Sequence, residues 1–257
     1  MANPTDATPL TGKRVLITGS SRGIGADTAK RMAALGARVA VNYRDKARRA
    51  EQVVGAIEGA GGTAIAVQAD LTDDAAVRAM LDEVREAWGG LDVLVLNASG
   101  GMEGGMPEDY ALRLNRDAQV GALRAALPLL GRGSRVVFVT SHQAHFIETT
   151  QTMPEYEPVA RSKRAGEDAL RGMASELDAA GVDLVVVSGD MIKGTITATL
   201  LERANPGAIA SREESAGRLY SVSEFAEEVV AAAIEPVPEH RTRFVGDVSS
   251  FTPVPGE

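Results

Sequence analysis

The sequence predicts an α/β fold, a single-domain, doubly wound parallel β-sheet of about seven strands with helices on both faces. Three observations predict it. Apolar, strand-like runs alternate with helix-like segments from end to end of the 257 residues. A glycine-rich turn joins the first of these strands to the first helix. No internal repeat, low-complexity tract or linker divides the chain, so one domain spanning 1–257 is expected.

The predicted elements follow one another in strand–helix order. Strands are expected at 14–18, 38–41, 64–68, 91–96, 135–140, 182–188 and 243–245. Helices are expected at 24–35, 46–58, 73–88, 107–130 and 158–180, with Thr72 as the N-cap of the third, and residues 196–204 are expected to form a short amphipathic lid. Unbroken apolar strands indicate a sheet buried on both faces, and right-handed crossovers then produce the doubly wound order.

Three long segments without a regular pattern follow predicted strands, at 99–106, 142–157 and 190–217. Loops that follow the strands of a parallel sheet build its binding site, so these segments are expected to form substrate walls. The segment 190–217 is interpreted as a lid over the substrate. The first ten residues are expected to be flexible.

Composition excludes several classes of protein. Hydrophobic residues make up 44% of the chain, which excludes a disordered protein. There is no cysteine, and therefore no disulfide or thiolate chemistry. A net charge of −8 disfavours nucleic acid as a partner. No apolar run is long enough to span a membrane and no signal peptide is apparent, so a cytoplasmic protein is expected.

The turn after the first strand carries Gly19, Gly23 and Gly25. Glycines let the backbone turn sharply and let a pyrophosphate approach the amides, and the helix that follows supplies free N–H groups. An ordinary turn would be the alternative. The strand before it and the helix after it favour a dinucleotide-binding site.

The glycine spacing is G-x-x-x-G-x-G, and Asp70-Leu71 and Asn97-Ala98 follow the third and fourth strands. Together these motifs resemble those of the short-chain dehydrogenase/reductases over residues 13–189. The resemblance implies a Rossmann-type domain, a nicotinamide cofactor, a small-molecule substrate and a homotetramer or homodimer. The cofactor-binding residues that it implies are Gly19, Ser21, Arg22, Gly23, Ile24, Asp70, Leu71, Asn97, Ala98, Ser99 and Lys163.

Cofactor preference is predicted from the end of the second strand. An acidic residue there would hold the ribose hydroxyls of NAD, whereas this chain has Asn42-Tyr43-Arg44. Arg44 and Arg22 suit a 2′-phosphate, because guanidinium groups match phosphate geometry. Asp45 weakens this argument, and Arg44 could be a solvated surface charge. NADP(H) is therefore favoured over NAD(H).

The family's catalytic residues are only partly present. Asn115, Ser141 and Lys163 match its Asn, Ser and Lys, with roles in holding a relay water, orienting the carbonyl and binding the ribose. The family's tyrosine would lie four residues before Lys163, where this chain has Val159. Tyr156 is the preferred substitute donor. On one continuous helix it would lie about 10 Å from Lys163 along the axis, against about 6 Å for the usual spacing.

Pro158 suggests that Tyr156 precedes the helix, in which case a turn could fold its phenol toward Ser141. A packing or lid role for this tyrosine is nearly as well supported. His142 and His145 are less favoured donors, and with Glu148 they could form a metal site, although no metal is expected.

Two functions from different classes remain open at this stage. The first is an NADP(H)-dependent oxidoreductase that transfers hydride between nicotinamide and a carbonyl or secondary alcohol. The second is a related protein that binds the dinucleotide without redox turnover, which Val159 supports. Intact Asn115, Ser141 and Lys163 favour the first.

Overall fold

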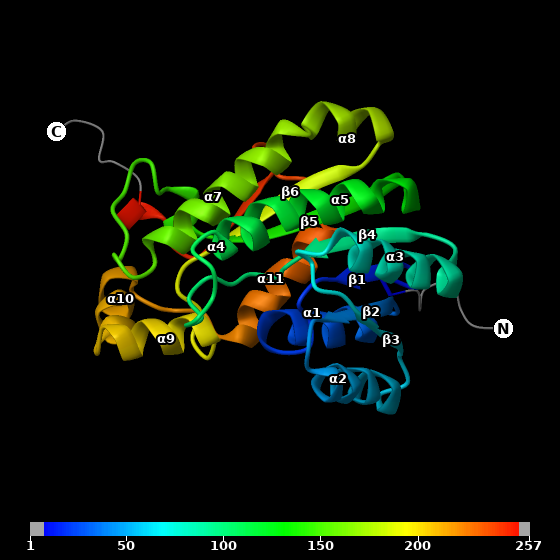
Figure 1. The fold of residues 1–257 in the computed structure, drawn as a ribbon, viewed down its shortest axis with the longest axis horizontal. Helices are drawn as coiled ribbons and strands as arrows, with labels where there is room; N and C mark the ends of the chain where they lie inside the picture. The colour runs from blue at the N-terminus through cyan, green and yellow to red at the C-terminus, as the bar shows by residue number, and fades with distance from the viewer. Residues whose placement is uncertain (1–7, 252–257) are drawn as a thin grey trace.

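The strands form one parallel sheet in the order β3-β2-β1-β4-β5-β6-β7 in the computed structural model, which describes residues 8–251. The order runs outward in both directions from β1 and β4, which confirms the predicted doubly wound sheet (Figure 1). The strands are β1 (Arg14–Ile17), β2 (Arg38–Tyr43), β3 (Thr63–Gln68), β4 (Leu91–Leu96), β5 (Leu130–Ser141), β6 (Asp183–Gly189) and β7 (Thr242–Val245).

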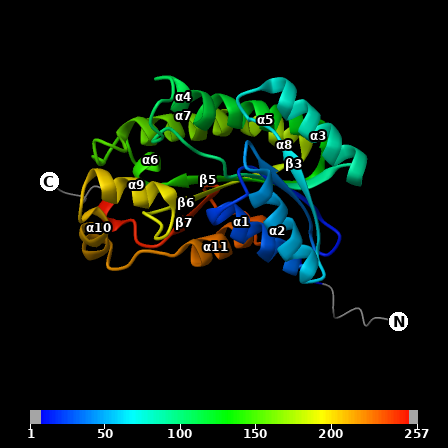
Figure 2. The ribbon, with the colours of Figure 1, turned by 60° about the horizontal axis from the view of Figure 1, so that its bottom comes forward.

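Helices cover both faces of the sheet (Figure 2). One face carries α1 (Gly23–Ala34), α2 (Ala47–Gly59) and α11 (Val222–Ile234), and the other carries α3 (Asp74–Trp88), α5 (Ala118–Ala126), α7 (Glu157–Gly172) and α8 (Ala174–Ala180). Side chains alternate between the two cores along each strand, so that Val15 and Ile17 join one core and Leu16 joins the other. The sheet is thus buried on both sides.

The predicted helix at 107–130 is wrong in its extent. A short helix, α4 (Tyr110–Leu112), leads into a wider π-helical turn (Arg113–Asp117), and α5 ends at Ala126. A 3-10 turn containing Pro128 then precedes β5, which takes up Leu130. Apolar periodicity does not reveal a π-turn, because one extra residue shifts the register without ending the pattern.

Other predicted boundaries also change. The helix expected at 158–180 divides at Met173, directly after Gly172, into α7 and α8. Asp73, not Thr72, caps α3, because its carboxylate accepts hydrogen bonds from the amides of Ala75 and Ala76. Thr72 instead donates to Asp70.

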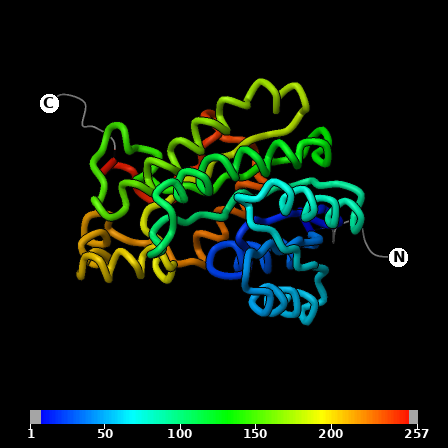
Figure 3. Tube along the Cα trace, viewed as in Figure 1, coloured from blue at the N-terminus to red at the C-terminus, as the bar shows by residue number. Residues whose placement is uncertain are grey.

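Two of the three segments expected to be irregular contain helices. The segment after β5 begins with α6 (His142–His145), and the segment after β6 contains α9 (Ile196–Ala204) and α10 (Ala208–Ala216). Both segments lie at the same end of the molecule (Figure 3) and share a small apolar cluster that includes Tyr156, Met191 and Leu201. This cluster places α9 and α10 beside the carboxyl ends of the central strands.

At the amino-terminal end, Leu10 is buried in the core and Thr8 hydrogen-bonds to Leu35. The remainder of the segment expected to be flexible, residues 1–7, lies outside the described residues. Within 8–251, no helix combines the length and the apolar character needed to cross a bilayer.

Candidate active site

The glycine turn between β1 and α1 is held in place by two asparagines. The Gly19 amide donates to Asn42 Oδ1 at 2.9 Å, and Asn97 Nδ2 donates to the carbonyl of Thr18 at 2.9 Å. Gly19 and Gly23 have φ values of +61° and +58°, which favour glycine. The turn is therefore fixed by backbone conformation and by contacts from β2 and β4.

Two features of this turn fit the diphosphate of a dinucleotide. A Cβ at Gly25 would lie 2.8 Å from the Cα of Ser20, so the helix start can approach the turn only with glycine there. In addition, no side chain caps α1, whose N-cap residue is Arg22. The first amides of α1 therefore keep their donors and the positive end of the helix dipole for an anion.

A cavity of about 690 Å³ extends from this turn along the carboxyl ends of the strands. It is large enough to hold a cofactor or a drug-sized molecule. The predicted cofactor and catalytic residues that line it are Gly19, Ser21, Arg22, Gly23, Ile24, Arg44, Asp70, Leu71, Asn97, Ala98, Ser99, Ser141, Tyr156 and Lys163. Asn115 is the predicted site residue that does not line it.

The end of the cavity beside β2 carries a group of cations. Arg44 lies there with Arg22, Lys46 and Arg49. The Arg44 guanidinium contacts Asp45 at 2.7 Å and donates to the hydroxyl of Tyr110 at 2.5 Å. Arg44 thus lies at the rim of the cavity with its side chain 45% exposed, and its guanidinium retains further donors for a ligand.

Ser141 and Tyr156 meet at the other end of the cavity. Ser141 Oγ lies 3.1 Å from the phenol oxygen of Tyr156, and both side chains are buried. Tyr156 is the residue that precedes α7, with Pro158 at the second position of the helix, so the phenol is brought to Ser141 by the turn before the helix. Burial raises the pKa of Tyr156, opposed by the hydrogen bond from Ser141. The phenol is therefore protonated at neutral pH.

Lys163 lies on α7 and is 8% exposed. Its ammonium forms neither a hydrogen bond nor an ion pair with any residue between 8 and 251. Burial lowers its pKa to about 8, while the carboxylate of Glu167, one turn later, acts in the opposite direction. An ammonium with free donors at a cavity wall is available to bind ligand hydroxyls.

Asn115 lies in the π-helical turn, and its side chain binds protein groups. Its amide donates to the carbonyl of Gly100 at 2.8 Å and to Ser162 Oγ at 2.9 Å. These bonds connect α7 to the segment that follows β4. A relay water held by Asn115 stays a prediction.

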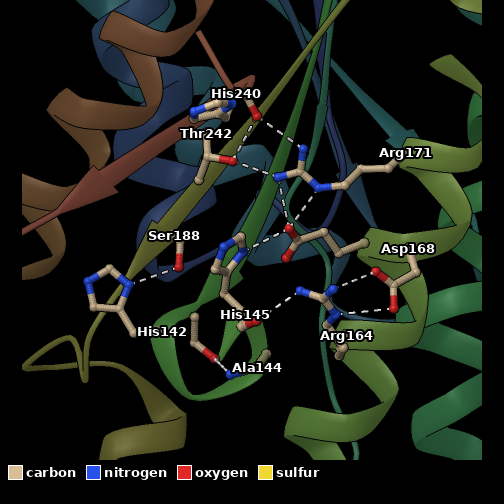
Figure 4. Close-up of polar contacts among 11 residues, drawn as sticks. His142, Ala144, His145, Arg164, Asp168, Arg171, Ser188, His240 and Thr242 are labelled. Carbon is tan, nitrogen blue, oxygen red and sulfur yellow. Dashed lines mark hydrogen bonds and ion pairs between the residues drawn. The ribbon is translucent and has the colours of Figure 1, made fainter. Parts of the chain in front are cut away.

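The two histidines after Ser141 contact residues outside the cavity lining (Figure 4). His142 Nδ1 lies 2.8 Å from Ser188 Oγ, and burial lowers the pKa of His142 to about 4. His145 Nδ1 lies 2.8 Å from the buried carboxylate of Glu167, which Arg171 also contacts at 2.9 Å. Neither histidine belongs to the cavity lining within the described residues, which disfavours both as proton donors.

The suggested metal site with Glu148 is likewise not formed. No cluster of three histidine, aspartate or glutamate side chains with ligand geometry exists in the described part of the chain. His145 instead contacts the buried carboxylate of Glu167.

Several lining residues were missed by sequence reasoning. Tyr110 and Gln143 reach the cavity from α4 and α6, and Asp190 and Met191 reach it from the end of β6. Apolar periodicity does not identify these residues, because they lie on very short helices or directly after a strand. Asn42 was noted only as a residue that is not acidic, yet its side chain holds the glycine turn.

The fold and this site define a dinucleotide-dependent oxidoreductase. The profile of the family described as short chain dehydrogenase matches residues 13–205. The chain belongs to this short-chain dehydrogenase/reductase family, and it is an NAD(P)-dependent oxidoreductase.

Similar proteins include several reductases. A hydroxynaphthalene reductase of Aspergillus fumigatus is 34% identical over 215 residues, which cover 80% of this chain and 76% of that protein. A versicolorin reductase of Emericella nidulans is 32% identical over 190 residues, or 72% of this chain and 70% of that protein. A short-chain dehydrogenase of Burkholderia cenocepacia, solved in complex with NADP, is 34% identical with a TM-score of 0.77, covering 93% and 98% of the two chains.

Proposed function

We propose that this protein is an NADPH-dependent ketone reductase in which Tyr156 replaces the proton donor missing at Val159. The observation that carries the proposal is the 3.1 Å contact between the Tyr156 phenol and Ser141 Oγ in the wall of the cavity. The test is NADPH oxidation with a panel of cyclic and aromatic ketones. Absence of turnover despite cofactor binding would favour the alternative of a dinucleotide-binding protein without redox activity.

The proposed division of roles follows from the positions of the side chains. The nicotinamide supplies the hydride that adds to the carbonyl carbon. Ser141 donates a hydrogen bond to the carbonyl oxygen, and the Tyr156 hydroxyl transfers its proton to that oxygen as the charge develops. Lys163 binds ribose hydroxyls through its free ammonium donors, and Asn115 positions α7 through Ser162 and Gly100.

The substrate is proposed to be a largely apolar ketone. Met191, Ala198 and Leu201 are buried and line the cavity at the end where α9 lies. The names of two relatives denote reductases of hydroxynaphthalene and versicolorin, and hydroxynaphthalenes are bicyclic aromatic alcohols. The segment 190–217, with α9 and α10, is proposed to act as the lid over this substrate.

NADP(H) is the proposed cofactor in preference to NAD(H). The four cations Arg44, Arg22, Lys46 and Arg49 outnumber the three nearby acidic groups at the β2 end of the cavity, which are Asp45, Asp70 and Glu103. The 2′-phosphate carries negative charge, and guanidinium groups bind it through charge-assisted hydrogen bonds. The NADP complex of the Burkholderia relative is consistent with this preference.

Replacing Arg44 by alanine should weaken NADPH binding by about 10- to 100-fold, the size of one or two hydrogen bonds to a charged group. NADH binding should change much less, because NADH has no 2′-phosphate. Fluorescence titration with both cofactors measures the effect. Arg85→Ala, on the exposed surface of α3, is the matched control. An equal loss for NADPH and NADH would contradict the role of Arg44.

The buried ammonium of Lys163 should produce a pH dependence. Its pKa of about 8 means that the protonated form is lost as the pH rises through 8, so kcat/KM for NADPH should fall there. Glu167→Gln removes the charge that opposes this lowering, and the falling limb should move to lower pH. Glu157→Gln, exposed on the same helix, should leave the profile unchanged. An identical profile for all three proteins would contradict the assignment.

A further inference from the structure

Gln143 is a buried polar residue in the cavity wall that has no hydrogen-bond partner within residues 8–251. It is 8% exposed and belongs to α6, directly after the strand that ends at Ser141. Its amide offers two donors and an acceptor with two lone pairs. An amide that opens into the cavity without a protein partner is available to bind a polar group of a molecule that enters.

Apart from the Lys163 ammonium, which is assigned to ribose hydroxyls, and the Thr140 hydroxyl, whose oxygen is sealed from solvent, the neighbouring polar groups at this end of the cavity have partners within residues 8–251. Ser141 and Tyr156 contact each other, and the carboxylate of Asp190 accepts hydrogen bonds from Arg212 at 2.7–2.9 Å. The remaining wall is apolar, with Met191 and Leu201 among its residues. Gln143 is therefore a mostly buried side chain with free hydrogen-bonding atoms beside the proposed reaction centre.

Gln143 lies close to the proposed reaction centre because it is tied to Ser141. Gln143 follows Ser141 by two residues, so the two Cα atoms lie within about 7 Å of each other. Ser141 also caps α6 by accepting a hydrogen bond from the Ala144 amide at 3.2 Å, which ties the short helix to the serine. The neighbouring His142 does not line the cavity, and its Nδ1 lies 2.8 Å from Ser188 Oγ (Figure 4).

We propose that Gln143 binds a second oxygen of the substrate, so that the preferred substrates are apolar ketones with a hydroxyl or second carbonyl group near the reduced one. This inference rests on the proposed function. The distance to Ser141 places the second oxygen within the length of a bicyclic molecule. A ketone without that oxygen leaves the amide unpaired and is reduced less efficiently.

The test compares 1-tetralone with its monohydroxylated isomers as substrates for the native enzyme and for Gln143→Leu. The measured quantity is the ratio of kcat/KM for each hydroxylated isomer to that for 1-tetralone. At least one isomer should show a ratio that falls about tenfold in the variant, the size of one hydrogen bond. A merely structural role for Gln143 would lower both values together and leave the ratio unchanged.

Gln151→Leu, an exposed glutamine in the segment before α7, is the matched control and should keep the native ratios. The inference would be overturned if the kcat/KM ratio of every isomer were the same in Gln143→Leu as in the native enzyme. Such a result would leave the proposed function intact, because NADPH would still be oxidised with the ketones. No oxidation of NADPH with any ketone would instead refute the proposed function, and this inference with it.

Discussion

Tyr156→Phe should lower kcat/KM for ketone reduction by about 10²- to 10⁴-fold, the contribution of a positioned general acid. The phenol is the buried hydroxyl that meets Ser141 in the cavity, and phenylalanine keeps the ring while removing the proton. Val159, at the position of the family's tyrosine, has no proton to donate. NADPH oxidation under steady-state conditions measures the loss.

The control for this substitution is Tyr220→Phe. Tyr220 lies outside the cavity lining, with the guanidinium of Arg218 4.3 Å from its ring centroid. This variant should retain native activity, and both variants should bind NADPH as the native enzyme does. Native turnover by Tyr156→Phe would remove the tyrosine from the mechanism. His145→Ala, and then His142→Ala, would be the next variants to assay, since these histidines are the other donors considered from the sequence.

Gly166→Ala should destabilise the protein by about 3 kcal/mol, the upper end of the cost of overpacking a core. A Cβ at this position would lie 2.0 Å from the carbonyl oxygen of Asn115. That oxygen belongs to the backbone and cannot rotate away, so α7 would have to move. Because α7 carries Lys163 and begins just after Tyr156, activity should fall as well.

Thermal unfolding measures this effect, and the melting temperature should fall by roughly 6–12 °C for a chain of this size. Gly172→Ala, in the last turn of the same helix, has no atom within 4 Å of the added Cβ. It should leave the melting temperature unchanged or raise it slightly, since alanine favours helix formation more than glycine. Equal melting temperatures for the two variants would show that α7 does not need glycine at position 166.

The close approach at Gly166 also explains a difference between prediction and structure. The sequence indicates one long helix at 107–130, but the chain forms a π-turn around Asn115. In that turn the Asn115 carbonyl faces α7, and its side chain bonds to Ser162 and Gly100. Contacts from a helix about fifty residues later determine this turn, so no local pattern could predict it.

The contact between Tyr156 and Ser141 also could not be predicted from the local sequence alone. Seven residues separate it from Lys163, and a continuous helix would hold the two side chains about 10 Å apart along its axis. Pro158 correctly indicated that the tyrosine precedes the helix. The contact with Ser141 depends in addition on where β5 ends relative to α7, which is a property of the assembled sheet.

The positions of Arg44 and of the two histidines also depend on tertiary contacts that the sequence does not reveal. The sequence allowed Arg44 to be a solvated charge, and its side chain is indeed 45% exposed, but a hydrogen bond to Tyr110 keeps it at the rim of the cavity. His142 and His145 flank the serine in sequence but contact Ser188 and Glu167, which do not line the cavity (Figure 4). Neighbouring residues on a short helix point in different directions, and only the packing of that helix decides which one faces the ligand.

The sequence by itself determined the parallel sheet, the glycine turn and the family, because each depends on short-range patterns of apolar residues and glycines. Only the tertiary structure decided which side chains meet in the cavity. Tyr156, Gln143 and Tyr110 reach it through turns whose direction is determined by packing against distant strands and helices. The physical reason is that backbone hydrogen bonding and hydrophobic alternation act over a few residues, whereas a site is assembled from segments that approach one another only when the core is packed.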